Sequence, residues 1–200
     1  MYERKDPLYQ RAKREGYRSR AAYKLLELQK RARVLRRGQA VVDLGAWPGG
    51  WLQVAAEIVG PSGVVVGIDR AAIDPLPLAH VTTLVGDVTD PDSVERLHAA
   101  LGRRADVVLS DLAPKLTGIA PRDEAAFEEL AAATRAVAVA LLARGGTLVT
   151  KTLGGREGEA ARAALRPLFA SVKQLGLEST RKGSSELYLV ATGCVKENQA

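Results

Sequence analysis

Four polar residues in this sequence have side chains suited to proton transfer and to the stabilisation of charge. Lys24 lies in SRAAYKLLEL, Asp111 follows VVLS, Lys151 ends GGTLVTK, and Glu186 begins ELYLVATG. Three of these segments join a β-type apolar run to a polar residue at its edge, where neighbouring strands can bring side chains together. Two amines and two carboxylates in one pocket could hold a substrate hydroxyl and move its proton. The sequence therefore predicts an active site.

Each of these residues also has an ordinary structural interpretation. A single lysine is usually solvated, and an aspartate after a strand is commonly part of a turn or a helix cap. All four could instead form buried salt bridges between a helix and the sheet. Because buried ion pairs often contribute little net stability, a purely structural role explains the presence of four such charged residues poorly. We therefore interpret the set as catalytic.

The elements that must position these residues alternate between short β-branched runs and helices rich in Ala and Leu. The expected strands are Ala40–Leu44, Val64–Ile68, Thr82–Val85, Asp106–Ser110, Gly146–Lys151, Val172–Leu177 and Glu186–Ala191. The expected helices are Arg20–Arg33, capped by Ser19, and Gly50–Val59, Ser93–Leu101, Arg122–Ala143 and Glu157–Ala170. The pattern predicts an α/β fold: a Rossmann-like, seven-stranded, mostly parallel sheet with helices on both faces. One strand should be antiparallel, because no helix separates the last two.

The first expected strand runs into a glycine-rich loop, Asp43–Trp51, where an open α/β sheet binds ligands. The loop has neither the GxGxxG of dinucleotide sites nor the Gly-Lys-Ser/Thr of phosphate loops. Asp69 ends the second strand and could accept from ribose hydroxyls, and Asp87 follows the third and could accept from the amine of adenine. Taken singly, the glycines could form only a turn and the acids only caps. Together they suit an adenosine-containing cofactor without a pyrophosphate, and S-adenosylmethionine fits best.

Positive charge is concentrated at the start of the chain. Residues 1–37 hold thirteen Lys or Arg and four acids, a net of +9, whereas the whole chain has a net charge of +6. Tyr2, Tyr9, Tyr17 and Tyr23 lie among these cations. This mixture is typical of surfaces that neutralise phosphates and stack on bases, although it could also be a solvated basic helix. We favour contact with RNA.

Composition limits the remaining possibilities. The 200 residues, 46% hydrophobic and 26% charged, suffice for one buried α/β core and little more. The single Cys194 cannot form an internal disulfide, and with only His80 and His98 as imidazoles we expect no metal. The charged amino terminus does not match a secretory signal, and Ala131–Ala143 is too short to span a bilayer. These features predict a cytoplasmic protein without a membrane partner.

Five segments occur along the chain in this order: SRAAYKL, DLGAWPGGW, SDLAPKLTG, VTKTL and SSELYLVATG. From about Tyr17 to Gly193 the chain resembles the FtsJ/RrmJ family of RNA ribose 2′-O-methyltransferases. The resemblance implies the Rossmann-like fold of S-adenosylmethionine-dependent methyltransferases. It implies a tetrad around the reacting ribose, formed here by Lys24, Asp111, Lys151 and Glu186. It also implies cofactor-binding positions at Gly49, Trp51, Asp69, Asp87 and Asp111.

The branch of this family that is closest in length and motifs methylates a uridine in the aminoacyl-site loop of large-subunit ribosomal RNA, within the assembled 50S subunit. We therefore expect RNA rather than DNA as the partner, and a monomer. Trp47 stands where a small residue is usual and could alter the wall of the cofactor pocket, whereas Lys115 stands where Asn is common and could alter RNA contact. The expected parts are a basic arm (1–18), the methyltransferase domain (19–193) and a tail (194–200).

Methylation of a ribose 2′-hydroxyl requires in-line positioning and removal of the hydroxyl proton. Lys151 is the expected base, although it could instead orient the hydroxyl and stabilise negative charge. Lys24 would bind the ribose or a phosphate, Asp111 would orient Lys151, and Glu186 would position Lys24 or the ribose. Other possibilities are a transfer-RNA anticodon-loop ribose as substrate, a non-catalytic RNA-binding assembly factor, and a nicotinamide-dependent oxidoreductase, which the missing GxGxxG disfavours.

Overall fold

The computed structural model describes residues 6–114, 117–180 and 183–195. Its strands form one sheet in the order β3-β2-β1-β4-β5-β7-β6. They are β1 (Ala40–Leu44), β2 (Val64–Asp69), β3 (Val81–Val85), β4 (Ala105–Ser110), β5 (Leu142–Leu153), β6 (Phe169–Leu175) and β7 (Glu186–Cys194). The pairs from β3 to β5 are parallel, whereas β7 runs antiparallel to both β5 and β6. The predicted Rossmann-like sheet with one antiparallel strand is thus confirmed.

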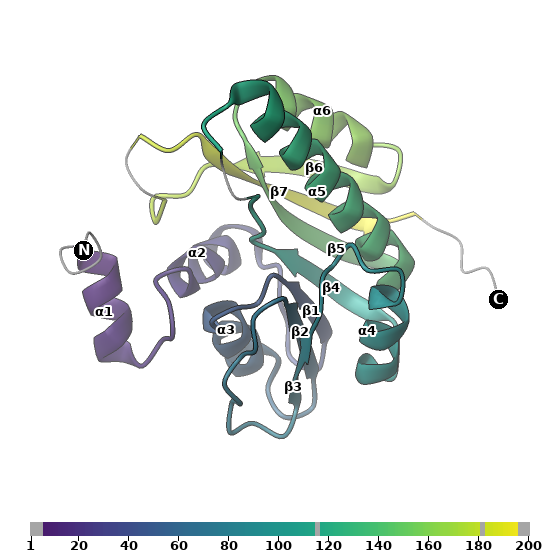
Figure 1. The fold of residues 1–200 in the computed structure, drawn as a ribbon. Helices are drawn as coiled ribbons and strands as arrows, with labels where there is room; N and C mark the ends of the chain where they lie inside the picture. The colour runs from purple at the N-terminus through teal and green to yellow at the C-terminus, as the bar shows by residue number, and fades with distance from the viewer. Residues whose placement is uncertain (1–5, 115–116, 181–182, 196–200) are drawn as a thin grey trace.

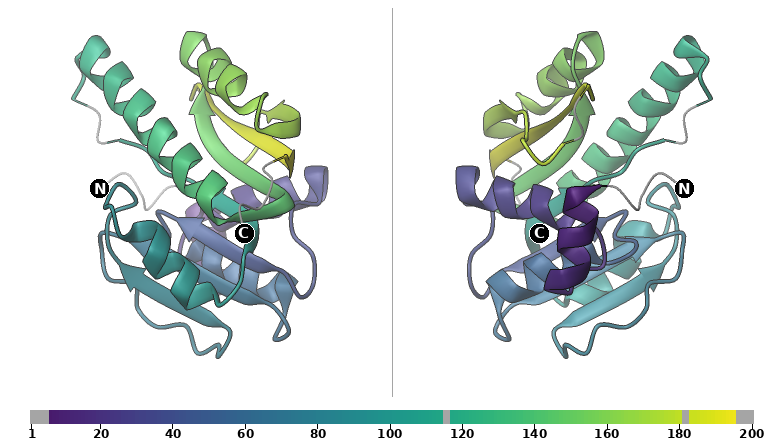
Figure 2. Two further views of the ribbon diagram at one scale, coloured as in Figure 1. Left: turned by 90° about the vertical axis from the view of Figure 1, so that its right-hand side faces the viewer. Right: turned by 90° about the vertical axis from the view of Figure 1, so that its left-hand side faces the viewer.

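Helices cover both faces of this sheet, as predicted. They are α1 (Pro7–Glu15), α2 (Ala22–Ala32), α3 (Gly50–Val59), α4 (Ser93–Leu101), α5 (Ala120–Leu141) and α6 (Arg156–Leu165). Figures 1 and 2 show α2 and α3 on one face and α4, α5 and α6 on the other, with α1 outside these layers. In the part of the chain that the structure describes, no helix is both long enough and apolar enough to cross a membrane.

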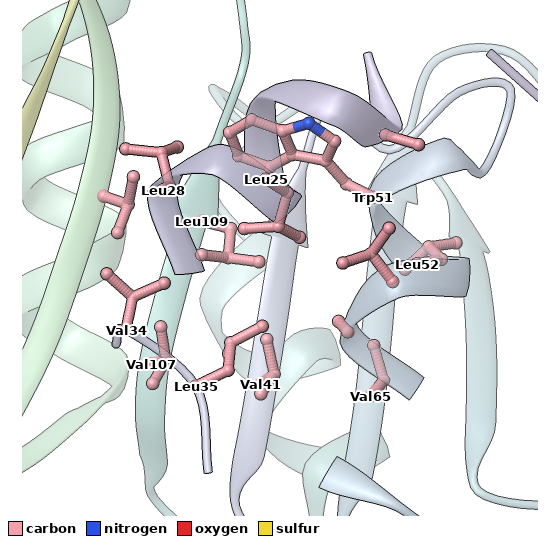
Figure 3. Packing of buried hydrophobic residues seen from close by; sticks show 14 of the residues in the cluster. Leu25, Leu28, Val34, Leu35, Val41, Trp51, Leu52, Val65, Val107 and Leu109 are labelled. Carbon is pink, nitrogen blue, oxygen red and sulfur yellow. The ribbon is translucent and has the colours of Figure 1, made fainter. Parts of the chain in front are cut away.

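The core on the α2 and α3 face fixes the position of the amino-terminal segment. Leu25 and Leu28 of α2 are fully buried beside Trp51 of α3, above the apolar strands of the sheet (Figure 3). Their spacing of three residues places both on one side of the helix. Since Lys24 adjoins Leu25, this packing also places Lys24 beside the sheet.

The start of α2 differs from the prediction. The helix begins at Ala22 rather than Arg20, and its cap residue Ala21 makes no side-chain cap hydrogen bond. Ser19 is therefore not the cap. Its buried Oγ has no hydrogen-bond partner, because the side chain faces Gly50, where a Cβ would lie 2.3 Å from this oxygen. Close packing against α3 has replaced the capping interaction.

Two helix ends were predicted too far along the chain. The helix expected to reach Ala143 ends at Leu141, and β5 begins at once. The helix expected to reach Ala170 ends at Leu165, and Phe169 already pairs with Cys194 in the β6–β7 ladder. In both places apolar residues that suit a helix are recruited into strand pairing, so tertiary contact overrides local propensity.

One helix was not predicted at all. Helix α1 lies inside the segment expected as a basic arm, and Asp6 caps it by accepting from the amides of Leu8 and Tyr9. Pro7 occupies its first turn, where the missing amide hydrogen is tolerated. At the other end of the chain, β7 continues through Cys194, the first residue of the expected tail.

Replacing Leu25 by Ala should lower the free energy of unfolding by about 2–5 kcal/mol, because the residue is fully buried between α2 and the sheet. Urea unfolding would measure the change. Ile119→Ala is the matched control, since Ile119 is 57% exposed and its loss should cost no more than about 0.5 kcal/mol. Equal effects of the two substitutions would contradict the packing of α2 described above.

Candidate active site and cofactor cavity

The structure brings all four predicted polar side chains together, from α2, the end of β4, β5 and the start of β7. Lys24 Nζ lies 2.7 Å from Glu186 Oε1 and 3.4 Å from Asp111 Oδ2. Lys151 Nζ lies 3.1 Å from Asp111 Oδ1 and donates a 2.6 Å hydrogen bond to the main-chain carbonyl of Asp111. These side chains are 10 to 18% exposed, so they are largely desolvated yet open to a substrate.

The direction of β7 explains how a residue near the end of the chain joins this group. Because β7 is antiparallel to β5, its first residues lie beside the last residues of β5, and Glu186 is paired with Leu153. Two residues further on, Tyr188 is paired with Lys151. Side chains two apart on a strand share a face, so Glu186 and Tyr188 point to the same side of the sheet.

Tyr188 is a member of the site that the sequence analysis missed. Its hydroxyl lies 2.6 Å from Asp111 Oδ1 and 3.0 Å from Glu186 Oε1. A phenol has one proton to donate, and the shorter distance favours Asp111. Burial raises the pKa of Tyr188, and the two carboxylates raise it further, so the residue remains a neutral donor. Its spacing from Glu186 and its place in an apolar strand were the signals available in the sequence.

A cavity of about 360 Å³ lies at the ends of β1, β2, β3 and β4, and its lining includes Leu112, the residue that follows Asp111. It opens where the strand order reverses between β1 and β4, which is the usual ligand position in such sheets. Its lining includes apolar and acidic side chains: Ile68, Val88, Leu112, Pro114, Leu130, Asp69 and Asp87. The volume and the mixed lining suit a small organic ligand.

Asp69 lines this cavity in a fixed orientation. Its Oδ2 accepts from the amide of Trp47 at 3.0 Å, and its Oδ1 accepts from the amide of Ala71 at 2.9 Å. Each carboxylate oxygen has a second lone pair, so further donors such as ribose hydroxyls can still be bound.

Asp87 lies on the same wall and is more heavily bonded. The amide of Thr89 donates to it at 2.9 Å and the Thr89 hydroxyl at 2.8 Å, while Arg70 forms an ion pair with Oδ2. The hydrogen bond from the Thr89 amide, despite some desolvation, holds the pKa of Asp87 below its usual value. Asp87 is thus a stable acceptor whose Oδ2 already has Arg70 as a partner.

Two further features lie at the end of β1: Gly45, which follows the strand and lines the cavity, and Asp43 within the strand. Gly45 has a φ of +80°, and a Cβ there would lie 2.4 Å from Leu112 Cδ2, so only glycine fits. Asp43 is buried with no hydrogen-bond partner for Oδ2. Burial, reinforced by Asp111 and Asp69, raises its pKa well above the ordinary value.

Tested against these features, the cavity fits S-adenosylmethionine. Asp69 and Asp87 offer acceptors suited to a ribose and an adenine, and with Glu129 they give the lining three carboxyl groups, which suits a positively charged ligand. Among residues 6–114, 117–180 and 183–195, no cluster of three or more His, Cys, Asp or Glu is arranged to hold a metal ion.

The other predicted cofactor positions lie around the loop between β1 and α3. Gly49 is the cap residue of α3 with a φ of +108°. The Trp51 side chain is buried away from the cavity, because its indole N–H donates to the Ala21 carbonyl and its ring lies 6.0 Å from that of Tyr188. A cofactor contact by Trp51 therefore stays a prediction that would involve its main chain. Trp47 is 59% exposed and is not part of the cavity wall, and Lys115 lies outside the described residues.

The fold and this cavity define a class: Rossmann-like methyltransferases. The sequence profile of the FtsJ-like methyltransferase family matches residues 17–194, and the chain belongs to this family. It is 46% identical over 190 residues to ribosomal RNA large subunit methyltransferase E of Halorubrum lacusprofundi, covering 94% of this chain and 71% of that protein. The protein of the same name from Acidithiobacillus ferrooxidans is 43% identical over 187 residues, covering 94% and 84%.

Solved structures show the same architecture. A crystal structure described as a candidate ribosomal RNA methyltransferase of Plasmodium falciparum has a TM-score of 0.78 and 28% identity, covering 90% of this chain and all of that one. Fibrillarin of Aeropyrum pernix, crystallised with natively bound S-adenosyl-L-methionine, has a TM-score of 0.62 and 17% identity, covering 88% and 75%. The latter likeness concerns the fold alone.

Asp43 should make the stability of the protein depend on pH. Because folding raises the pKa of Asp43, the protonated carboxyl group favours the folded state. This contribution to the free energy of unfolding is fully present below about pH 4, where the unfolded side chain is also protonated, and is lost as the pH rises. Asn resembles the neutral carboxyl group. We therefore expect the free energy of unfolding of Asp43→Asn to decline less than that of the wild type as the pH is raised from about 4 to 8.

Urea unfolding across this pH range would provide the measurement. Asp74→Asn is the control, because Asp74 is exposed and its loss should leave the pH dependence unchanged. If Asp43→Asn and the wild type showed parallel pH dependences, the carboxyl group would not be held neutral by burial.

Proposed function

We propose that this protein transfers a methyl group from S-adenosylmethionine to a ribose 2′-hydroxyl of large-subunit ribosomal RNA. One observation carries the proposal: two lysines and two carboxylates converge beside a cavity that fits the cofactor, in a chain of the FtsJ-like methyltransferase family. When bound, S-adenosylmethionine supplies a methyl group activated by a sulfonium. The side chains of the site hold the accepting hydroxyl and manage its proton.

Lys151 is the group that contacts the hydroxyl. Lys151 Nζ contacts the side-chain carboxylate and the main-chain carbonyl of Asp111, and these two contacts fix its orientation. The remaining direction is available to the ribose oxygen. In its neutral form, Nζ takes the hydroxyl proton as the O–H bond breaks. The ammonium so formed is stabilised by the Asp111 carboxylate and stays beside the reacting oxygen.

Lys24 and Glu186 position the ribose. Their 2.7 Å ion pair joins α2 to β7, and Lys24 lies close to Lys151 because both contact the Asp111 carboxylate. The Tyr188 hydroxyl donates to Asp111 and lies 3.0 Å from Glu186 Oε1. Since each charged group has a partner, the site is preorganised before RNA arrives, which lowers the cost of reorganisation during the reaction.

The proposed substrate is a uridine in the aminoacyl-site loop of the RNA of the 50S subunit. The names of the relatives support a large-subunit ribosomal RNA, and the family resemblance supplies the nucleotide. Lys13 and Arg14 are exposed cations on α1, which contacts α2, the helix that carries Lys24, through the hydrogen bond from Tyr23 to Glu15. Arg11 is exposed as well but is paired with Glu15. Such a surface can neutralise phosphates next to the site.

Incubation with a radiolabelled methyl donor tests this function directly. The substrates to compare are 50S subunits, naked ribosomal RNA and transfer RNA, each taken from cells that lack the corresponding modification. We expect label on one ribose of the 50S subunit, mapped by its resistance to alkaline cleavage. Label in the transfer-RNA anticodon loop would overturn the substrate. RNA binding with neither cofactor binding nor transfer would instead favour a non-catalytic RNA-binding factor.

Replacing Lys151 by Ala should reduce the rate of methyl transfer at least ~10²-fold, at the lower end of a general-base contribution. The dissociation constant for the cofactor should be unchanged, because Lys151 does not line the cofactor cavity. Single-turnover kinetics and calorimetric binding would separate the two effects. Near-normal turnover would remove the proposed role of Lys151.

The substitution Asp69→Ala should act in the opposite way. It removes the proposed acceptor for the ribose of the cofactor, so cofactor affinity should fall by about tenfold or more, as expected for lost hydrogen bonds to a charged group. The rate at saturating cofactor should change little. An unaltered dissociation constant would show that the adenosine binds elsewhere.

A further inference from the structure

Arg18, a cation of the segment expected to contact RNA, is half-buried and hydrogen-bonded to the protein's own main chain. Its guanidinium donates to the main-chain carbonyls of Pro48, Asp74 and Pro75, the last at 2.9 Å. Pro48 belongs to the glycine-rich loop between β1 and α3, whereas Asp74 and Pro75 follow β2. One side chain therefore joins two loops at the ends of neighbouring strands.

The main chain around Arg18 is also attached to α3. Gln53 of α3 accepts from the amide of Arg18 at 2.8 Å through Oε1, and donates to the carbonyl of Gly16 at 2.9 Å through Nε2. Tyr17 reaches Glu57, one turn further along the same helix, at 3.2 Å. The segment between α1 and α2 is thus hydrogen-bonded along α3. These bonds fix the main chain of Arg18, so its side chain extends to the glycine-rich loop from a fixed position.

The side chain of Arg18 lies directly against Gly49. A Cβ at Gly49 would lie 3.0 Å from Arg18 Cδ and 3.1 Å from its Nη1. A guanidinium has five donors in a rigid plane, so it can bridge several carbonyls in a way that a single ammonium cannot. Loop carbonyls without a protein donor are hydrogen-bonded to water. The hydrogen bonds from Arg18 replace that water and restrict the movement of both loops.

We propose that Arg18 is a positioning residue that holds the glycine-rich loop in the conformation that binds the cofactor. It acts through Pro48 and Gly49, on the same loop whose Gly45 lines the cofactor cavity. The proposal rests on the proposed use of S-adenosylmethionine. The proposal gives Arg18 a different role from the exposed cations of α1. Arg18 supports cofactor binding, whereas the α1 cations contact RNA.

The test compares Arg18→Ala, Arg18→Lys and Arg14→Ala in the full chain. Arg14 is the matched control, because it is an exposed arginine four residues away on the same arm. For Arg18→Ala we expect the KM and Kd for S-adenosylmethionine to rise about tenfold, the size of effect given by loss of hydrogen bonds to a charged group. The kcat at saturating cofactor and the salt dependence of RNA binding should be unchanged. Arg18→Lys should recover part of the cofactor affinity.

Arg14→Ala should show the reverse pattern, with weaker RNA binding, a smaller salt slope and an unchanged cofactor Kd. Hydrogen exchange gives a readout that needs no catalysis: the amides of Trp47 and Gly49 should exchange faster in Arg18→Ala than in the wild type. These amides now donate to Asp69 and Ala46.

Three results would overturn the proposal. They are an unchanged cofactor Kd in Arg18→Ala, a reduced salt slope equal to that of Arg14→Ala, or a general loss of stability in which kcat and every KM change together and Lys restores nothing. Wild-type protein that binds no S-adenosylmethionine would instead refute the proposed function itself, which keeps the two failures distinct.

Discussion

The carboxylate of Asp111 is the interaction on which the site depends. Tyr188 and Lys151 both approach its Oδ1, Lys24 approaches its Oδ2, and its main-chain carbonyl accepts from Lys151 as well. A largely desolvated carboxylate needs such partners, because an unpaired buried charge is expensive. The same contacts therefore satisfy Asp111 and fix the directions of both amines. Asp111 therefore needs the same partners for the stability of the fold and for the chemistry of the site.

Much of this arrangement could be predicted from the sequence. The alternation of β-branched runs and helices indicated the sheet, and Asp111 and Lys151 follow from the rule that ligands gather at the carboxyl ends of parallel strands. Glu186 fits the same site only because β7 is antiparallel; the absence of a helix between the last two strands predicted that one of them is antiparallel, and the structure shows that it is β7. In these cases the decisive information was local: strand ends and their polar neighbours.

What could not be predicted depends on contacts between distant segments. Tyr188 reads as one more apolar strand residue until the register with Lys151 is known. Arg18 and Arg20 read as free cations, yet Arg18 is bonded to loop carbonyls and Arg20 to Asp6 and Ser179. The partners of these long side chains come together only in the folded chain. Because such partners bind part of the positive charge, counting Lys and Arg in the sequence overestimates the positive charge available on the surface.

The place of β7 in the sheet has a consequence for biosynthesis. This last strand lies between β5 and β6, both of which precede it in the chain, and it contributes Glu186 and Tyr188. A nascent chain emerges from its amino terminus and can fold the earlier strands first. Until β7 inserts, however, β5 and β6 have an open gap between them and Asp111 lacks one of its donors. During synthesis the chain therefore closes its sheet and completes the group of side chains around Asp111 in a single event.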